Sequence, residues 1–482
     1  MSYAKPISAT RVQAQKLSWT VLPSGPSEAI SNPDVRRFTA RVLDNAYGPD
    51  VTRQKRAWVV VNPNAGPGGA TKIWEKHVKP IFEGAKMPLT VVQTKAAREG
   101  IDLAKDLNID DFDIAVPCSG DGGPHEIFNG LGKRSDARRA LSKIAVCHIP
   151  CGSGNALSCN IYGSHHPTLA ALAIVKGVPT PLDLMSVTQD DTRILSFLSQ
   201  AYGVMADIDI KTEHLRWMGE TRFTVGFLQL VLKKKTYPCD IAFKVEIDGK
   251  ENIRAHYRNH VEGSGQPSPD GKEAVDGLSD ATADSSEEQG LPPLKFGTVE
   301  DKLPEGWEVL PYENLGYFYC GNVSAIQCPF LSKAFGIDSY QNLLRLGVTA
   351  AVVLFMAAQT NTQQMGYVAP GMNFFPAALH NDGLMDLITM AGDHPPLKMI
   401  ALQGKVPNNQ FFDSDLVTYR KVSAFRLSPR THDVDGVVSI DGEQVPYSPF
   451  QAEVHPGLGL TLTRTGKFEA PGPQGWETAP RG

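Results

Sequence analysis

Short apolar runs alternate with segments of helical periodicity between Arg56 and about Lys176. We predict strands at residues 58–62, 89–93, 113–117 and 144–149, and helices at residues 70–83, 98–107, 125–131 and 168–176. Strands that alternate with helices in this way form βαβ units. Residues 53–180 are therefore predicted to form an α/β domain on a mostly parallel, twisted, Rossmann-like sheet.

Glycine-rich turns follow three of the four predicted strands, at Asn62–Gly69, Ser119–Gly123 and Pro150–Asn155. The carboxyl ends of parallel strands share one edge of the sheet, which is where ligands bind in open α/β folds. Glycines let backbone N–H groups approach an anion closely, and a helix N-terminus adds partial positive charge. Any one of these turns could be an ordinary tight turn, but three at the same edge favour a phosphate-binding site.

Asp121 lies inside the second of these turns, between a predicted strand and a predicted helix. A carboxylate is a poor phosphate ligand because like charges repel, but it suits a general base or a magnesium partner. A base placed within a phosphate-binding edge indicates phosphoryl transfer.

Several other site patterns do not fit these turns. The first turn is not a P-loop, because no Gly-Lys-Ser/Thr follows it, and the second has His125 where a dinucleotide fingerprint has its third glycine. Ser153 is not in a hydrolase elbow, since Cys151 and Asn155 stand where that motif has glycines. A zinc-protease motif beginning at His125 would need a second histidine four residues later, and the chain has none there.

The second half of the chain has a different texture. From Pro181 onward β-rich segments follow one another with few helices between them, which predicts a largely antiparallel β-sandwich domain over residues 181–467. The predicted strands are residues 182–187, 193–202, 240–247, 315–326, 421–427, 437–440 and 458–463. Helices are predicted near residues 208–222, 224–233 and 331–358.

The remaining segments are weakly patterned. Residues 1–52 are predicted to be an N-terminal extension and residues 468–482 a loose tail. An acidic, Gly/Ser/Pro-rich insertion at about residues 260–295 is predicted to be disordered, with eight acids and one lysine between Glu262 and Gly290. That insertion accounts for the net charge of −5, so the rest is nearly neutral and lacks the basic face of a nucleic-acid-binding protein.

The cysteines and the apolar segments of the chain indicate the cellular compartment in which the protein is expected. The seven cysteines are odd in number and form no Cys-x-x-Cys pair, which favours free thiols in a reducing compartment. The first residues show no apolar core of a secretory signal. The strongest apolar run, Val348–Ala358, is far shorter than the ~20 residues of a membrane span. We therefore expect a cytoplasmic protein.

The motifs, taken in order, resemble those of lipid kinases with a diacylglycerol-kinase-type catalytic domain, and most closely those of sphingosine kinases. The matching segments lie between about residues 55 and 465 and read VVNPNAGPGG, VPCSGDGGPHEIFNGL, IPCGSGNALSCN, SQAYGVMADIDIKTEHLRWMGETRF, FFPAALHNDGLMDL and SIDGEQV. The resemblance implies an active site in the cleft between the two domains, with ATP and Mg²⁺ as cofactors and a sphingoid long-chain base as substrate.

The resemblance also implies a role for each matching residue. Asp121 would be the general base that takes the proton from the primary hydroxyl of the lipid. The substrate would be framed by Ser119, Gly120, Gly122, Ser199 and Asp209, of which Asp209 would face the ammonium group. ATP would be held by Asn62, Pro63, Asn64, the segment from Thr94 to Arg98, Glu126, Gly152, Ser153, Gly154, Arg216, Arg222, Asp441, Gly442 and Glu443.

Physical considerations leave alternatives open for some of these residues. Arg216 and Arg222 lie six positions apart, so they would diverge on a straight helix unless the chain bends, for which Gly219 is suited. Without the resemblance both would be read as solvated helix charges. Asp209 could be a turn carboxylate, but a buried aspartate needs a cationic partner, which a sphingoid amine would supply.

The long lipid tail requires an apolar tunnel, which residues 330–358 could line, although an ordinary pair of core helices explains their pattern equally well. Extraction of a lipid implies transient peripheral membrane contact, and a homodimer is left open. The first glycine turn departs from the family, because Pro67 and Gly69 stand where a lysine is often found.

Two other functions compete with sphingoid-base phosphorylation. A ceramide or diacylglycerol kinase of the same fold would have no reason to place the carboxylate of Asp209 against a neutral head group. A non-catalytic lipid-binding scaffold would have no need of a base beside a phosphate cradle.

Overall fold

The computed structural model describes residues 46–66, 68–152, 154–212, 214, 221–263, 290–322, 374–403, 405–406, 410–431, 436–470, 472–473 and 476. The chain divides into two compact units. The first unit comprises Met1–Arg134, Arg139–Pro181 and Gly459–Glu469, and the second comprises Ser135–Arg138, Leu182–Leu458 and Ala470–Gly482.

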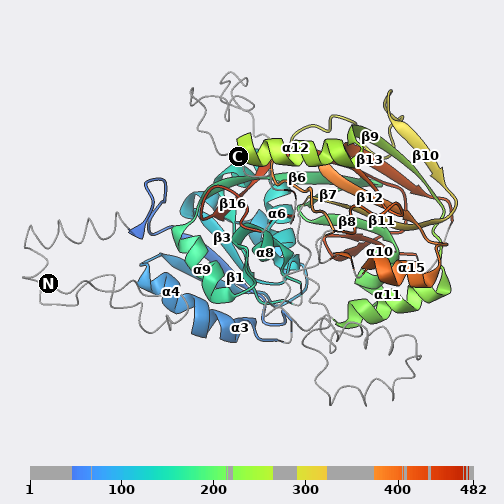
Figure 1. Ribbon diagram of the computed structural model, residues 1–482. Helices are drawn as coiled ribbons and strands as arrows, with labels where there is room; N and C mark the ends of the chain where they lie inside the picture. Colours follow the sequence, from blue (N-terminus) through green and yellow to red (C-terminus); the bar gives the residue numbers. More distant parts are fainter. Residues whose placement is uncertain are drawn as a thin grey trace, which may run out of the picture. The chain divides into compact units, whose positions relative to one another are not determined.

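The first unit is built on a parallel five-stranded sheet in the order β2-β1-β3-β4, with β5 also paired to β3 (Figure 1). The strands are β1 (Ala57–Val61), β2 (Leu89–Gln93), β3 (Ile114–Ser119), β4 (Ala145–Val146) and β5 (Ile149–Pro150). Every residue of β1 and β3 is buried, as expected for central strands of a parallel sheet covered on both faces. The prediction of a parallel α/β domain is confirmed.

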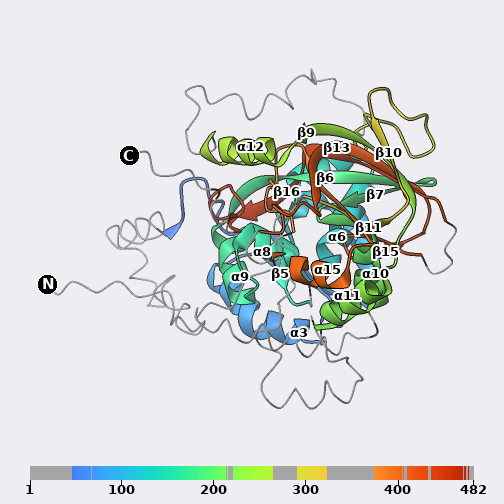
Figure 2. The same cartoon turned by 45° about the vertical axis from the view of Figure 1, so that its right-hand side comes forward.

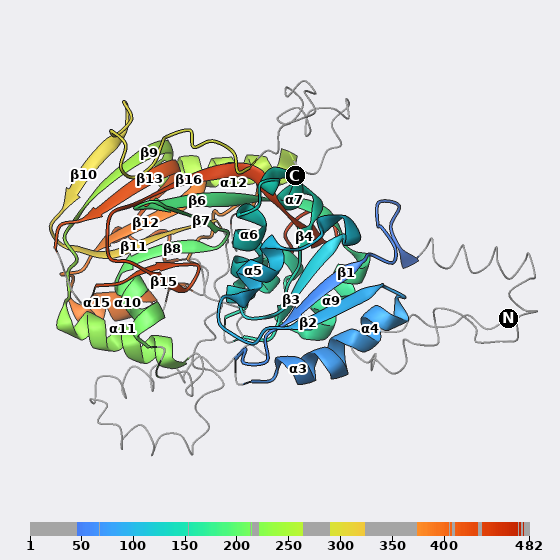
Figure 3. The ribbon, with the colours of Figure 1, turned by 180° about the vertical axis from the view of Figure 1, so that it is seen from behind.

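The helices of this part of the chain follow the strands. They are α3 (Ala70–Ile73), η3 (Trp74–Val78), α4 (Lys79–Gly84), α5 (Glu99–Lys105), α6 (Gly122–Gly132), α7 (Ala137–Lys143), α8 (Ala156–Tyr162) and α9 (Pro167–Lys176). Helix α9 lies in front of the sheet in Figure 1, and α5 and α6 lie in front when the unit is seen from behind in Figure 3. Helices therefore cover both faces of the sheet.

The second unit contains an antiparallel, curled sheet, which confirms the predicted antiparallel character (Figure 2). Its main path runs β15-β14-β8-β11-β12-β13-β16-β6-β7, and β9 joins through β13 and carries β10. The strands are β6 (Val178–Gln189), β7 (Thr192–Ser196), β8 (Ser199–Gly203), β9 (Cys239–Asp248), β10 (Glu308–Tyr312), β11 (Leu315–Gly321), β12 (Met385–Ala391), β13 (Thr418–Pro429), β14 (Val438–Ile440), β15 (Glu443–Val445) and β16 (Phe450–Thr463).

The helices of the second unit gather at two places. Helices α10 (Val204–Lys211), α11 (Thr221–Lys233) and α15 (Pro396–Gln403) lie together beside β8 and β11, whereas α12 (Lys250–Gly263) lies against β9 and β13 (Figures 1 and 2). The helix predicted at residues 331–358 lies outside the described residues. None of the helices in the described part of the chain combines the length and apolarity that a membrane span requires.

One boundary between the units falls between Pro181 and Leu182. The end of β16 and the residues that follow it, Gly459–Glu469, belong to the first unit. Two contacts explain this placement: the Thr461 hydroxyl donates to the Val146 carbonyl at 2.8 Å, and the Thr180 and Thr463 hydroxyls lie 2.8 Å apart. Helix α12 runs through the first residues of the predicted acidic insertion, whose residues 264–289 lie outside the described chain.

Candidate active site

The three glycine-rich turns meet at one edge of the sheet in the first unit. A Cβ atom built on Gly66, whose φ is +56°, would lie 2.7 Å from the carbonyl oxygen of Cys151. A Cβ atom on Gly152 would collide with the Cα atom of Gly120. The backbones of the first and second turns therefore each approach the third turn too closely for any side chain but hydrogen.

Asp121 lies where the second and third turns touch. Its Oδ2 accepts a hydrogen bond from the Ala156 N–H at 2.8 Å, and its Oδ1 accepts one from the Leu157 N–H at 3.0 Å. Its own N–H donates to the carbonyl of Gly154 at 3.3 Å. These contacts place the carboxylate at the N-terminus of α8, where the helix dipole stabilises negative charge. The side chain is 11% exposed, so it is held in place without being sealed off from solvent.

His148 lies behind Asp121 and was not predicted as a site residue. The side chain is fully buried, its Nε2 lies 3.0 Å from the Ser119 carbonyl oxygen, and its Nδ1 lies 3.9 Å from Asp121 Oδ1. Burial lowers the pKa of His148, while the Asp121 carboxylate and the Ser119 carbonyl oppose that shift. His148 therefore contacts the end of β3 and lies beside the Asp121 carboxylate. These residues are distant in the sequence and come together only in the folded chain.

Asn155 closes the third turn and was likewise missed. Its Oδ1 accepts from the Gly152 N–H at 3.0 Å, and its Nδ2 donates to the Gly152 carbonyl at 2.8 Å. Burial raises the pKa of the neighbouring Cys151 thiol to about 12, which favours the protonated thiol at neutral pH. Ser153 lies outside the described residues.

The other predicted nucleotide and substrate residues of the first unit lie around these turns. Asn62 forms a local turn, since its Oδ1 accepts from the Asn64 N–H at 3.0 Å. The Glu126 carboxylate accepts from the Gly100 N–H at 2.9 Å and so ties α6 to the first turn of α5. The Ser119 hydroxyl donates to the Gly120 carbonyl at 2.8 Å. Their roles toward ATP and substrate remain predictions.

In the second unit, Asp209 lies near the end of α10 and accepts a hydrogen bond from Ser439 of β14, Oγ to Oδ2, at 2.6 Å. Its neighbour Asp207 has a different environment, because Lys211 and Lys235 ammonium groups lie 2.9 and 3.2 Å from its carboxylate and the Tyr237 hydroxyl donates to it. Asp207 is therefore a buried, internally neutralised structural carboxylate. Asp209 is the partly exposed one of the two.

Asp441 is buried and holds the loop between β7 and β8. Its carboxylate accepts from the Ser196 hydroxyl at 2.6 Å and from three backbone N–H groups, those of Phe197, Leu198 and Ser199, at 2.9 to 3.1 Å. The Asp441 N–H donates back to the Ser199 carbonyl at 2.8 Å. The Asp441 carboxylate therefore stabilises the β7–β8 loop within the second unit. Gly442 and the partly exposed Glu443 follow it at the turn into β15.

Arg216 and Arg222 were predicted to contact the phosphates of ATP. Arg216 and the predicted bend at Gly219 lie outside the described residues, and Arg222 is described only as a backbone position in α11. Across the described part of the chain, no group of three or more His, Cys, Asp or Glu side chains is arranged to hold a metal ion. Magnesium carried by nucleotide phosphates needs only one or two protein carboxylates, and we predicted no direct protein ligand for it.

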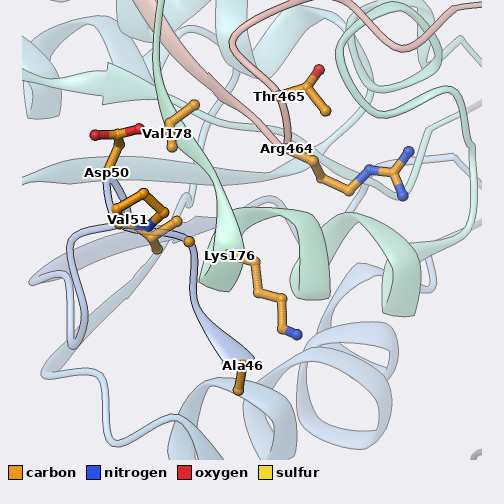
Figure 4. Close-up of a pocket in the computed structure, with 9 residues that line it drawn as sticks. Ala46, Asp50, Val51, Lys176, Val178, Arg464 and Thr465 are labelled. Carbon is orange, nitrogen blue, oxygen red and sulfur yellow. The ribbon is translucent and has the colours of Figure 1, made fainter. Parts of the chain in front are cut away.

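A separate pocket of about 370 Å³ lies elsewhere on the first unit (Figure 4). It is lined by Ala46, Gly48, Pro49, Asp50, Val51, Lys176, Val178, Arg464 and Thr465, none of which belongs to the predicted site. Figure 4 shows Asp50 and Val51 on one side, with Lys176 and Arg464 on the other. Arg464 pairs with Glu469 at 2.7 Å, and we assign no role to this pocket.

Comparison with known proteins assigns this combination of a parallel α/β unit with converging glycine turns and an antiparallel β unit to the lipid kinases of the diacylglycerol-kinase type. Residues 56–187 match the family described as diacylglycerol kinase catalytic domain. Residues 337–463 match the family described as YegS C-terminal NAD kinase beta sandwich-like domain. A solved structure from Bacillus anthracis, presented as a candidate diacylglycerol kinase, shares the fold with a TM-score of 0.51 at 15% identity, covering 86% of this chain and 99% of that one.

Relatives that match most of this chain identify its family within the lipid kinases. Sphingoid long chain base kinase 4 of Schizosaccharomyces pombe is 31% identical over 433 residues, which cover 90% of this chain and 80% of that protein. Sphingoid long chain base kinase 5 of Saccharomyces cerevisiae is 29% identical, with 89% of this chain aligned to 62% of that protein's length. Human sphingosine kinase 2 is 28% identical over 87% of this chain and 73% of its own length. The chain belongs to the sphingoid long-chain-base kinase family.

Proposed function

We propose that this protein transfers the γ-phosphoryl group of ATP to the primary hydroxyl of a sphingoid long-chain base. Asp121 takes the hydroxyl proton as the lipid oxygen attacks phosphorus, and the bond to the bridging oxygen breaks, so that ADP leaves with the electron pair. The observation that carries this proposal is the Asp121 carboxylate, fixed by the Ala156 and Leu157 N–H groups at the junction of the second and third glycine turns.

The physical chemistry of phosphoryl transfer supports these roles. Such transfer needs positioning and positive charge around the phosphate more than covalent participation by the protein. The glycine turns would bind phosphate oxygens through backbone N–H groups, with the segment Asn62–Asn64 and Glu126 around the rest of ATP. Mg²⁺ would accompany the nucleotide and neutralise its charge. The Ala156 and Leu157 amides that hold Asp121 fix the orientation of its carboxylate, which a general base requires.

Asp209 supports the choice of a sphingoid base over a neutral lipid alcohol. Its carboxylate is partly exposed and accepts a hydrogen bond from Ser439, which orients it. An ammonium group beside a partly desolvated carboxylate contributes binding energy that a diacylglycerol cannot supply. We further place the reaction in the cytoplasm at a membrane surface that the protein contacts transiently.

The direct test measures ATP-dependent phosphorylation of sphinganine, sphingosine, ceramide and diacylglycerol by the purified chain with Mg²⁺. We expect phosphorylation of the two amine-bearing bases to exceed that of the neutral lipids at least tenfold in kcat/KM, because about 1.4 kcal/mol of head-group recognition suffices for that ratio. Preference for ceramide or diacylglycerol would replace the proposed substrate, and absence of transfer to every lipid would favour a binding scaffold.

The role of Asp209 is tested by Asp209→Asn. We expect KM for sphinganine to rise about 30-fold, because a charge-assisted contact contributes roughly 2 kcal/mol, with KM for ATP unchanged within about twofold. Asp191, an exposed aspartate between β6 and β7, supplies the matched control Asp191→Asn, which should leave both constants unchanged. Equal increases in both KM values would contradict recognition of the amine.

A further inference from the structure

The short segment Ser439–Asp441 contacts both residues that we assign to the lipid head group. Ser439 Oγ donates to Asp209 at 2.6 Å, and Asp441 exchanges hydrogen bonds with Ser199, accepting from its N–H at 2.9 Å and donating to its carbonyl at 2.8 Å. Asp441, at the end of this segment, was predicted to bind ATP. The structure also connects the segment to Ser199 and Asp209, the two residues predicted to bind the lipid head group.

The strand geometry explains why Ser439 faces Asp209. Val438 and Ile440 of β14 are fully buried in the apolar core, so the alternation of a strand directs Ser439 to the opposite face. Helix α10, which carries Asp209, packs against β14 and follows β8 directly. β14 pairs with β8, with Ser439 opposite Ala201, so the serine and the helix are held in one register.

The burial of Ser439 gives its hydroxyl a specific purpose. The residue is 1% exposed, and a buried hydroxyl without a partner would cost free energy. Its donation to Asp209 satisfies the hydroxyl and fixes the rotamer of the carboxylate. A carboxylate that lost this hydrogen bond would be less restrained in orientation and would bind a cation less well.

We propose that Ser439 is a positioning residue for head-group recognition: its hydroxyl holds the carboxylate of Asp209 in the orientation that binds the ammonium group of the substrate. This inference rests on the proposed function and extends it to a residue on a different strand. Asp441 lies two residues after Ser439 and binds the backbone of Ser199. It therefore stabilises the loop that carries the second residue predicted to bind the head group.

The test compares Ser439→Ala with Ser439→Thr by steady-state kinetics on sphinganine and ATP. Because a hydrogen bond to a charged group contributes about 1.5 kcal/mol or more, Ser439→Ala should raise KM for sphinganine about tenfold and leave KM for ATP unchanged. Ser439→Thr retains the hydroxyl and suits a strand, so it should stay within about threefold of wild type. The matched control is Ser423→Ala, which removes a serine–carboxylate bond to Glu246 from the same sheet.

A double variant separates positioning from a general structural effect. If Ser439 acts through Asp209, Ser439→Ala should add less than about twofold to KM when Asp209 is already asparagine. A full additional tenfold, an equal rise in KM for ATP, or an unchanged KM in Ser439→Ala would overturn the inference while leaving the proposed function intact. If Asp209→Asn itself leaves KM for sphinganine unchanged, amine recognition by Asp209 fails and the role of Ser439 fails with it.

Discussion

Asp121→Asn is expected to lower kcat for sphinganine phosphorylation about a thousandfold, within the range that loss of a general base produces. An amide cannot take up the hydroxyl proton at neutral pH, so the lipid oxygen would have to attack without deprotonation. Affinity for a non-hydrolysable ATP analogue, measured by calorimetry, should change less than about threefold, because the backbone N–H groups of the turns remain and asparagine approximates aspartate in shape.

The contacts of Asp121 predict a smaller structural effect in the same variant. The asparagine oxygen can accept from only one of the two N–H groups, of Ala156 and Leu157, that the carboxylate now binds. We therefore expect a loss of about 1 kcal/mol in stability, typical of a weakened helix cap. Asp113→Asn is the matched control, because Asp113 lies just before β3, the strand that Asp121 follows, and pairs with Arg56. This control variant should leave turnover unchanged. A variant at position 121 that keeps a tenth of wild-type kcat would refute the base assignment.

The first unit shows what local sequence can predict about this site. Strand and glycine-turn signals act over a few residues, so the parallel sheet and the shared edge of its three turns could be predicted. The support of Asp121 could not, because its partners Ala156, Leu157 and His148 lie 27 or more positions away along the chain. Helix α8 was missed for the same reason: its cap comes from Asp121 rather than from the residue before it.

The second unit shows where pattern reasoning was wrong. Residues 193–202 read as one strand, but the chain breaks between β7 and β8 because Asp441 draws the N–H groups of Phe197 and Leu198 out of the sheet. Strand β12 was missed because six of its seven residues are buried, which erases the alternation of a half-exposed strand. Helix α12 was missed because Ile253 is its only fully buried residue among those whose side chains are described.

The segment Phe374–Leu387 supplies two aspartates to a buried charge cluster in the second unit, which its sequence did not reveal. Lys421 of β13 is fully buried, and its Nζ lies 2.8 Å from Asp382 and 3.1 Å from Asp386. The Tyr419 hydroxyl donates to Asp386 at 2.6 Å, and His256 Nε2 lies 3.0 Å from Asp382. Burial raises the pKa of Asp386 to about 6 even with the lysine beside it.

Lys421→Met should therefore destabilise the protein by about 3–5 kcal/mol, because it leaves two buried carboxylates without their cation. In a unit of this size each kcal/mol lowers the melting temperature by about 2–4 °C, so a decrease of about 10 °C is expected by circular dichroism. Lys398→Met, at an exposed lysine of α15, is the matched control and should change stability by less than about 0.5 kcal/mol.

The pH dependence of this loss distinguishes electrostatics from poor packing. In the variant, the folded pKa values of Asp382 and Asp386 should lie above the unfolded value of about 4, so the folded state binds more protons and stability falls as pH rises. The deficit should thus be larger at pH 8 than at pH 5. Adding Asp386→Asn removes one of the unpaired charges and should recover part of the loss. A deficit that is independent of pH and is not relieved by Asp386→Asn would show that Lys421 acts through packing alone.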